Sequence, residues 1–247
     1  MKRILGWNDW YIHPFTLLYV LVSYINDSVI EYLMALGIVC FHEMFHYIFA
    51  KIYNFEIDSV EVLPFGAFLS LQDYGLHHIV EELITILAGL CSHFFLYFII
   101  INFGANPYLL AVNKLVFIFN VLPIYPLDGS KIILLVLSIF MDYQKAIKLQ
   151  IKISILALSI LFVTQPQVSH LIVYAYLLYL NYQYIKEYRI YLVRLYTSRR
   201  NTQIYKKYKV HKTFKFVRPY QNMYQIDNTL YHEEEVLTEL IKTIKNN

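Results

Sequence analysis

The sequence predicts an all-α polytopic membrane protein with about six transmembrane helices, and its composition is the first reason. Of the 247 residues, 58% are hydrophobic and 16% are charged, whereas soluble domains have about 45–50% and about 25%. So few charged residues cannot cover the surface of a protein in water. The hydrophobic excess lies in long runs, and a run of about 20 apolar residues spans the roughly 30 Å hydrocarbon core of a bilayer.

Six apolar runs are the candidate spans, and a further short run follows the fourth. The short run, 132–140, cannot cross a bilayer alone, so we expect it to continue the fourth span beyond a break. The six candidate spans cover residues 12–25, 29–51, 83–103, 107–122, 153–163 and 168–185.

The distribution of positive charge is the second reason for this fold class. Eleven of the 21 Lys and Arg residues lie between Lys186 and Arg218, directly after the sixth run, with Glu187 as the one acidic residue among them. A basic segment next to a span is typical of the cytoplasmic side of a membrane, so we expect no nucleic-acid binding. Six crossings then place both termini in the cytoplasm of a multi-pass cell-membrane protein.

Two parts of the chain are expected to differ from the helical bundle. A Pro64-Phe65-Gly66 turn between two short β-prone stretches predicts a small membrane-dipping β-hairpin. Non-helical backbone at that depth is tolerated only against protein or a wet cavity, so the hairpin should mark a cavity. We expect a transmembrane domain over residues 1–190 and a short, basic cytoplasmic tail over 191–247 that ends in an amphipathic helix. Its expected apolar face consists of Val236, Leu237, Leu240, Ile241 and Ile244.

The strongest chemical signal is the pattern HExxH, formed by His42, Glu43 and His46 within the second run. On a helix, residues i and i+4 share a face, so both imidazoles can bind one ion while Glu43 lies beside the water bound to that ion. Zinc lowers the pKa of such a water to about 7, and a neighbouring carboxylate can take its proton. A charge in the middle of a spanning helix costs about 2.5–3.5 kcal/mol, which favours this interpretation over a structural Glu–His pair.

A zinc site of this kind requires a third protein ligand, and Asp128 is the best candidate. It follows two prolines, Pro123 and Pro126, which cannot both lie in one continuous helix, so the fourth span must break before it. The break should expose backbone carbonyls to an extended strand of substrate, and it frees Asp128 to turn toward the metal. The residues expected to contact substrate are Pro123, Pro126, Pro64, Phe65 and Gly66.

The two motifs together resemble a known family. HExxH on an early membrane helix, followed by the sequence NxxPxxPLDG that begins at Asn120, is similar to the site-2 protease family of intramembrane zinc metalloproteases, peptidase family M50. Within that family the chain most resembles the sporulation branch, the stage IV sporulation protein FB type, which processes pro-sigma-K. The resemblance extends to the entry of the first run at His13, the hairpin, and Ala88-Gly89 with His93 in the third run.

The resemblance implies a set of roles and partners. His42, His46 and Asp128 would be the ligands of one zinc ion, Glu43 the general base, and Asn120 a residue of the substrate cleft. The substrate would be a membrane-associated pro-protein, such as a sporulation sigma-factor precursor, and inhibitory membrane proteins would be further partners. A sporulation member would lie in the outer forespore membrane. The sequence leaves a homo-oligomer open.

Other functions remain open from the sequence. In a membrane metalloprotease with a gluzincin-type site, Glu81, Glu82 or Glu187 would be the third ligand, although none lies in a second helical motif. A membrane metal transporter or metal-sensing protein would use the same His and Asp side chains without hydrolysis. A catalytically silent interaction protein is less attractive because Glu43 is intact.

Overall fold

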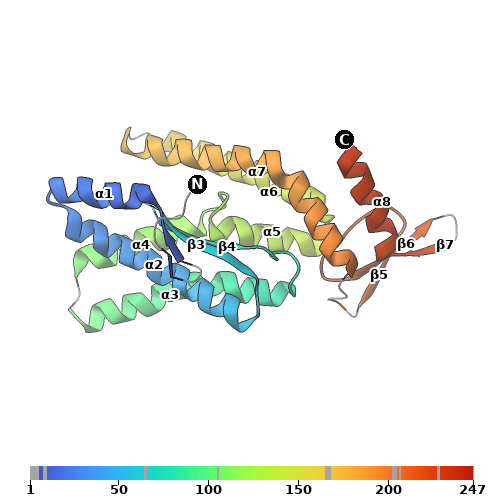
Figure 1. Ribbon diagram of the computed structural model, residues 1–247, viewed down its shortest axis with the longest axis horizontal. Coiled ribbons are helices and arrows are strands. Elements are labelled where there is room, and N and C mark those ends of the chain that lie inside the picture. Colours follow the sequence, from blue (N-terminus) through green and yellow to red (C-terminus); the bar gives the residue numbers. More distant parts are fainter. Residues whose placement is uncertain are drawn as a thin grey trace. The chain divides into compact units, whose positions relative to one another are not determined.

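The computed structural model describes residues 6–7, 10–63, 66–104, 106–164, 168–201, 205, 207–226 and 229–246 of the chain. Its elements, labelled in Figure 1, belong to two compact units. The first unit consists of Met1–Tyr74 and Leu83–Asn120, and the second of Gly75–Glu82 and Val121–Asn247.

Four apolar helices contribute to the first unit: α1 (Pro14–Ile25), α2 (Val29–Ile52), most of α3 (Ile79–Asn102) and α4 (Pro107–Val121). The sequence determines where α1 begins, because Pro14 occupies its first turn, in which a missing N–H leaves no hydrogen bond unmade. The His13 side chain caps this end by accepting the backbone N–H of Phe15 at 3.3 Å. The four helices match the first four predicted apolar runs.

The predicted hairpin is present, and it is part of a larger sheet. Strands β3 (Ile57–Leu63) and β4 (Gly66–Leu71) pair antiparallel, and both pack against α2. Strands β1 (Gly6–Trp7) and β2 (Trp10–Ile12), which the sequence did not predict, extend the sheet in the order β1-β2-β3-β4. Strand β2 is parallel to β3, and β4 is left as an edge strand.

The second unit contains α5 (Asp128–Phe140), α6 (Tyr143–Thr164) and α7 (Val168–Asn201). Helix α6 packs against both α5 and α7, and Figure 1 shows α6 and α7 side by side. The predicted break after the fourth apolar run is present, because α4 ends at Val121 and α5 begins at Asp128.

The tail forms a small folded body in the second unit instead of a lone helix. Strands β5 (Tyr208–His211), β6 (Gln221–Ile226) and β7 (Thr229–His232) make a three-stranded sheet in that order. Helix α8 (Glu233–Asn246) follows and packs against β6, β7 and α7. Helix α8 lies where the sequence predicts an amphipathic helix, and Val236, Leu237 and Ile241 of the predicted apolar face are buried.

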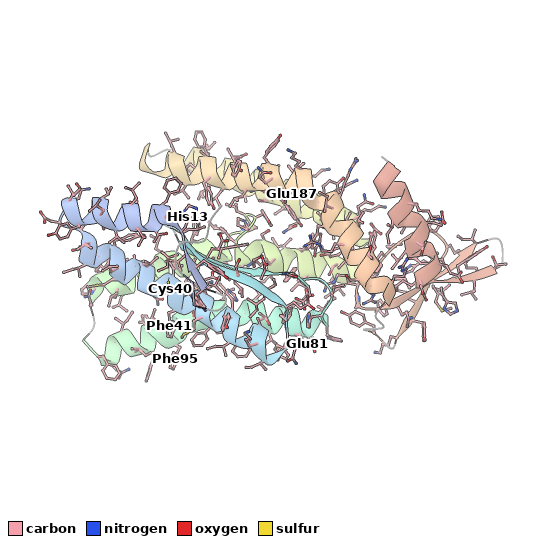
Figure 2. All side chains as sticks on the ribbon, viewed as in Figure 1. His13, Cys40, Phe41, Glu81, Phe95 and Glu187 are labelled. Carbon is pink, nitrogen blue, oxygen red and sulfur yellow. The ribbon has the colours of Figure 1, made fainter. Side chains whose placement is uncertain are left out.

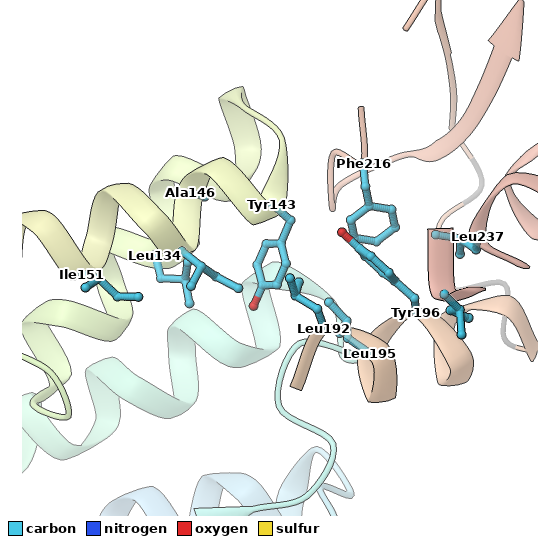
Figure 3. Close-up of a cluster of buried hydrophobic side chains, with 11 residues drawn as sticks. Leu134, Tyr143, Ala146, Ile151, Leu192, Leu195, Tyr196, Phe216 and Leu237 are labelled. Atoms are coloured by element: carbon cyan, nitrogen blue, oxygen red, sulfur yellow. The ribbon is translucent and has the colours of Figure 1, made fainter. Parts of the chain in front are cut away.

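One hydrophobic cluster joins this tail to the helices of the second unit (Figure 3). Tyr143 at the start of α6 is fully buried, and its ring meets the ring of Phe216 edge to face at 6.3 Å between centroids. Tyr196 on α7 makes a similar contact with Phe216 at 5.2 Å. The predicted division of the chain at residue 190 stays a prediction.

Two buried ion pairs fix the tail further. Arg218 donates to both carboxylate oxygens of Glu82, at 2.9 Å and 2.6 Å, and both side chains are almost fully buried. Burial lowers the pKa of Arg218, but the charge and hydrogen bonds of Glu82, together with Tyr143 and Tyr191, raise the pKa above its ordinary range. Arg199 on α7 donates to Glu233 at the start of α8 at 2.9 Å. The bidentate pair of Arg218 and Glu82 fixes the relative orientation of the two side chains and also balances their buried charges.

Three helices of the described chain are long and apolar enough to cross a membrane: Val29–Ile52, Ile79–Asn102 and Tyr143–Thr164. Helices α1 and α4 are apolar but shorter. The chain is mostly helical, as predicted, with two small sheets added. Six spans and the location of both termini stay predictions.

Candidate metal centre

The buried face of α2 carries both histidines of the HExxH motif. Its buried residues are Ile38, His42, His46 and Ala50, which recur every four positions and therefore lie along one side of the helix. The two histidines are thus the polar residues on an otherwise apolar side of the helix. Beside it, Phe41 of α2 stacks on Phe95 of α3, with centroids 6.3 Å apart and planes 5° apart (Figure 2).

Backbone carbonyls of α3 orient both imidazoles. Nδ1 of His42 lies 2.9 Å from the carbonyl oxygen of Gly89, and Nδ1 of His46 lies 2.8 Å from that of Thr85. A carbonyl oxygen can only accept, so each Nδ1 carries the hydrogen. In a neutral ring the hydrogen is then absent from Nε2, which is the state that binds a metal.

A glycine is required where α3 approaches α2 most closely. A β-carbon built at Gly89 would lie 2.1 Å from Nε2 and 2.2 Å from Cε1 of His46. Real β-carbons do not approach a heavy atom that closely, so any other residue would displace the imidazole. Gly89 therefore serves the site by its lack of a side chain, besides supplying the carbonyl that orients His42.

The two Nε2 atoms converge. They lie 3.0 Å apart, and the rings are nearly perpendicular. Two neutral rings with their hydrogens on Nδ1 would bring two lone pairs together at this distance, which is unfavourable unless a cation or a proton lies between them. The donor chemistry therefore fits a metal ion that prefers nitrogen ligands, such as zinc.

Glu43 lies beside this pair. One oxygen of its carboxylate is 3.9 Å from Nε2 of His42, and its side chain is 13% exposed, whereas that of His42 is 1% exposed. The carboxylate is therefore next to the converging nitrogens and is still reachable by water. This combination is what a general base in a hydrolytic site needs.

Asp128 is the first residue of α5 and is buried. Its position in the first helical turn favours a carboxylate, because the backbone N–H groups there are not used within the helix. Lys131, one turn later, donates to its Oδ1 at 3.0 Å. The next residue, Gly129, allows close packing, since a β-carbon there would lie 2.1 Å from the carbonyl oxygen of Val121.

Polar side chains of α6 and α7 hold the break before α5. Ser154 accepts the backbone N–H of Tyr125 at 2.8 Å, and Asn181 donates to the Tyr125 carbonyl at 3.0 Å. Ser154 also donates to Asn181 at 2.7 Å. Non-helical backbone within a membrane protein must be satisfied internally, so this network keeps the break in one conformation and fixes the start of α5.

The three predicted metal ligands come together. Each of His42, His46 and Asp128 offers one ligand atom, these atoms all lie within 4.8 Å of one another, and all three residues are buried. The glutamates of the gluzincin alternative are not in this group: Glu82 pairs with Arg218, and Glu187 is exposed (Figure 2).

The predicted substrate residues have mixed outcomes. Asn120 is half-buried and donates to the carbonyl of Val116 in its own helix at 3.1 Å. Gly66 begins the edge strand β4. Pro123 and Pro126 are half-buried within the break. Pro64 and Phe65 lie outside the described residues.

Sequence reasoning missed one polar pair near the site. His93 on α3, for which the sequence favoured packing over contact with the cavity, has its ring 4.9 Å from that of His42. Its Nδ1 lies 2.7 Å from Oδ1 of Asn113 on α4, and the Asn113 amide donates to the His93 carbonyl at 2.9 Å. Asn113 is a buried amide in the middle of an apolar helix, and that position was the signal in the sequence.

Comparisons with known proteins agree with this arrangement. The fold is that of a site-2 protease: the structure of the site-2 protease from Methanocaldococcus jannaschii matches with a TM-score of 0.56 and 21% sequence identity, over 74% of this chain and 94% of that one. In sequence, the chain is 29% identical over 180 residues to stage IV sporulation protein FB of Bacillus subtilis. That match covers 68% of this chain and 62% of the relative, so the chain spans less than two thirds of the relative's length. No family model matches the chain.

The two motifs indicated a resemblance to the site-2 protease family. A sequence comparison and a fold comparison both confirm this resemblance. The relatives and the apolar helices agree that this is a membrane protein.

Proposed function

We propose that this protein is an intramembrane zinc metalloprotease that hydrolyses a peptide bond in or near a membrane segment of a pro-protein. The observation that carries the proposal is the pair of Nε2 atoms of His42 and His46, 3.0 Å apart, with the Glu43 carboxylate 3.9 Å from one of them. The similarity to stage IV sporulation protein FB and the site-2 protease fold support it. Transport or sensing of a metal does not require a carboxylate beside the ligands, and the comparisons do not favour it.

His42, His46 and Asp128 are the residues that would hold one zinc ion, because two neutral imidazoles and a carboxylate leave the fourth position open. A zinc ion bound there would polarise the scissile carbonyl and lower the pKa of a water molecule to about 7. The carbonyls of Gly89 and Thr85 keep both imidazoles in the tautomer and orientation that this requires.

Glu43 moves the proton. Its carboxylate accepts one proton from the attacking water, and the remaining hydroxide adds to the carbon of the scissile carbonyl. The tetrahedral intermediate collapses when Glu43 returns that proton to the nitrogen of the leaving amine, and the C–N bond breaks. One water is consumed, and a carboxyl and an amino terminus are formed.

The substrate must be extended where it is cut, because the turns of a helix shield its own peptide bonds. Strand β4 offers a free edge to which an extended strand can add by backbone hydrogen bonds. Gly66 begins that strand. We include Pro64, Phe65, Pro123, Pro126 and Asn120 in the substrate path on the basis of the sequence.

Several finer features belong to the same proposal. They are six spans with both termini in the cytoplasm, a sporulation sigma-factor precursor as substrate, the outer forespore membrane as location, inhibitory membrane proteins as partners, and a homo-oligomer. The basic segment after residue 186 supports the orientation, and the similarity to a sporulation protein supports the substrate and the location.

The test is co-expression with a panel of membrane-tethered pro-proteins. We expect the unchanged protein to cleave at least one of them, and Glu43→Gln to retain zinc but lose cleavage. Glu31→Gln is the matched control, because Glu31 is an exposed glutamate on the same helix. Continued cleavage by Glu43→Gln would exclude the mechanism. Zinc flux into dye-loaded vesicles without cleavage would favour the transporter.

A further inference from the structure

An open groove of about 400 Å³ lies between α3 and α4. Three residues spaced along one face of α3 line it, together with five along one face of α4. The wall is almost entirely apolar and includes the aromatic rings of Phe94, Tyr97 and Phe117. The lining residues used below are His93, Phe94, Tyr97, Asn113, Lys114 and Phe117. We call this feature the α3–α4 groove.

Lys114 is the unusual member of this lining. It is exposed on α4 and is the one charged residue of a helix that is otherwise apolar apart from Asn113 and Asn120. It lies seven residues from Pro107 and seven from Val121, so the helix extends about 10 Å beyond it on either side. A four-carbon side chain is too short to cover that distance and reach the helix end. In the six-span arrangement proposed above, a lysine in the middle of α4 lies within the bilayer, and such a residue marks a site with a partner for its charge.

The chemistry of the groove identifies the partner. Phe94 and Phe117 pack edge to face at 5.2 Å between centroids, which gives the groove a rigid apolar wall. Asn113 is already bonded to His93, so Lys114 remains as the group that can select a ligand by charge. An occupant must therefore be apolar along its length and must carry an anionic group level with Lys114. A membrane-spanning helix with one Asp or Glu in its middle third meets both requirements.

We propose that the α3–α4 groove docks the membrane segment of the substrate and that Lys114 selects segments that carry a carboxylate at its depth. The groove is connected to the metal centre through one residue, since His93 lines it and its ring lies 4.9 Å from that of His42. A segment held there is anchored beside the site while its neighbouring residues unwind. This inference rests on the proposed proteolytic function and adds a property of the substrate.

Binding of model helices tests the inference separately from proteolysis. The full chain, with Glu43→Gln to prevent turnover, is reconstituted in neutral phosphatidylcholine vesicles. Fluorescence transfer then reports its association with single-span poly(Leu-Ala) helices that carry a central Asp, Asn or Lys. We expect the Asp helix to bind about tenfold more tightly than the Asn helix. Lys114→Met should abolish the difference, and Lys114→Asp should transfer the preference to the Lys helix.

A matched control and the opposite outcomes complete the test. Lys152→Met removes an exposed lysine from another apolar helix, α6, and should leave the Asp preference intact. Equal binding of the Asp and Asn helices, or a preference that survives Lys114→Met, overturns the inference. The protein purified before reconstitution is also assayed for bound phosphatidylglycerol. Loss of this lipid in Lys114→Met, with unchanged helix binding, assigns the lysine to a lipid and also overturns the inference. Because cleavage is not measured, none of these results depends on the outcome of the Glu43→Gln cleavage test.

Discussion

The backbone of Gly89 lies so close to the imidazole of His46 that a β-carbon on Gly89 would be 2.1 Å from Nε2. The same residue accepts the Nδ1 hydrogen of His42 through its carbonyl. One glycine on α3 therefore determines the positions of both histidines on α2. This dependence can be measured through metal content.

We expect Gly89→Ala to lose most of its bound zinc, because the added methyl group displaces the His46 ring from the position where it meets His42. Zinc per protein, measured by atomic absorption after purification, checks the result. Gly37→Ala is the control, since a β-carbon at Gly37 of α2 meets nothing within 4 Å, and an alanine there favours the helix by up to about 1 kcal/mol. Full zinc content in Gly89→Ala would show that the close contact does not constrain the site.

Asp128→Asn should weaken zinc binding at least about tenfold. Loss of a residue that only supports a ligand costs about 10–100-fold in metal affinity, and loss of a ligand should cost no less. Competition with a chelator of known affinity measures the change. Asp58→Asn provides the comparison, because Asp58 is an exposed carboxylate that accepts a hydrogen bond from Gln72. Equal zinc affinity in both variants would remove Asp128 from the ligand set.

Most of the fold and the metal centre followed from local patterns in the sequence. Apolar runs predicted the helices because lipid requires apolar side chains on them, and the spacing of His42 and His46 predicted a shared face. The pair of prolines predicted the break before Asp128. These predictions needed no knowledge of distant contacts.

The features that were missed depend on contacts between distant residues. Strand β2 pairs with β3 across more than 40 residues, and only three residues of β2 take part, too few for a periodic signal. In the tail, Arg199 of α7 and Glu233 of α8 form an ion pair although they are 34 positions apart in the sequence. Asn113 was visible as a polar residue in an apolar run, but its partner, His93, was not.

Arg218→Met should destabilise the attachment of the tail strongly. The change leaves the Glu82 carboxylate buried without its cation, and breaking a buried pair in this way costs about 3–5 kcal/mol. If tail opening is fast relative to cleavage, trypsin should cut the 207–226 segment more than about a hundredfold faster. Lys242→Met breaks an exposed pair with Glu239 and should change the rate little. Equal rates for the two variants would contradict the structural role of Arg218.

The tail should lose stability as the pH falls. Burial lowers the pKa of His211 below its ordinary value of 6.5, and the charges of Lys209 and Lys215 act in the same direction. The unfolded tail then binds more protons than the folded tail at pH values below about 6.5, so acid favours unfolding. Hydrogen exchange in β5 and β6 at pH 7.5 and 5.5, corrected for its intrinsic pH dependence, measures this.

A pair of histidine variants assigns that pH dependence. His211→Gln should remove most of the difference between the two pH values, because the group whose pKa is shifted is absent. His232→Gln, a change at an exposed histidine of β7, should preserve the difference. The opposite pattern would assign the acid sensitivity of the tail to another group.

The ion pair between Glu82 and Arg218 also has a consequence for synthesis of the chain. The two residues are separated by 136 positions, and ribosomes add about 5–20 residues per second. Glu82 is therefore made roughly 7 to 27 s before its cation exists. During that interval the start of α3 must keep its carboxylate in contact with water or bind a temporary partner, so the third helix reaches its final depth only after Arg218 has been made.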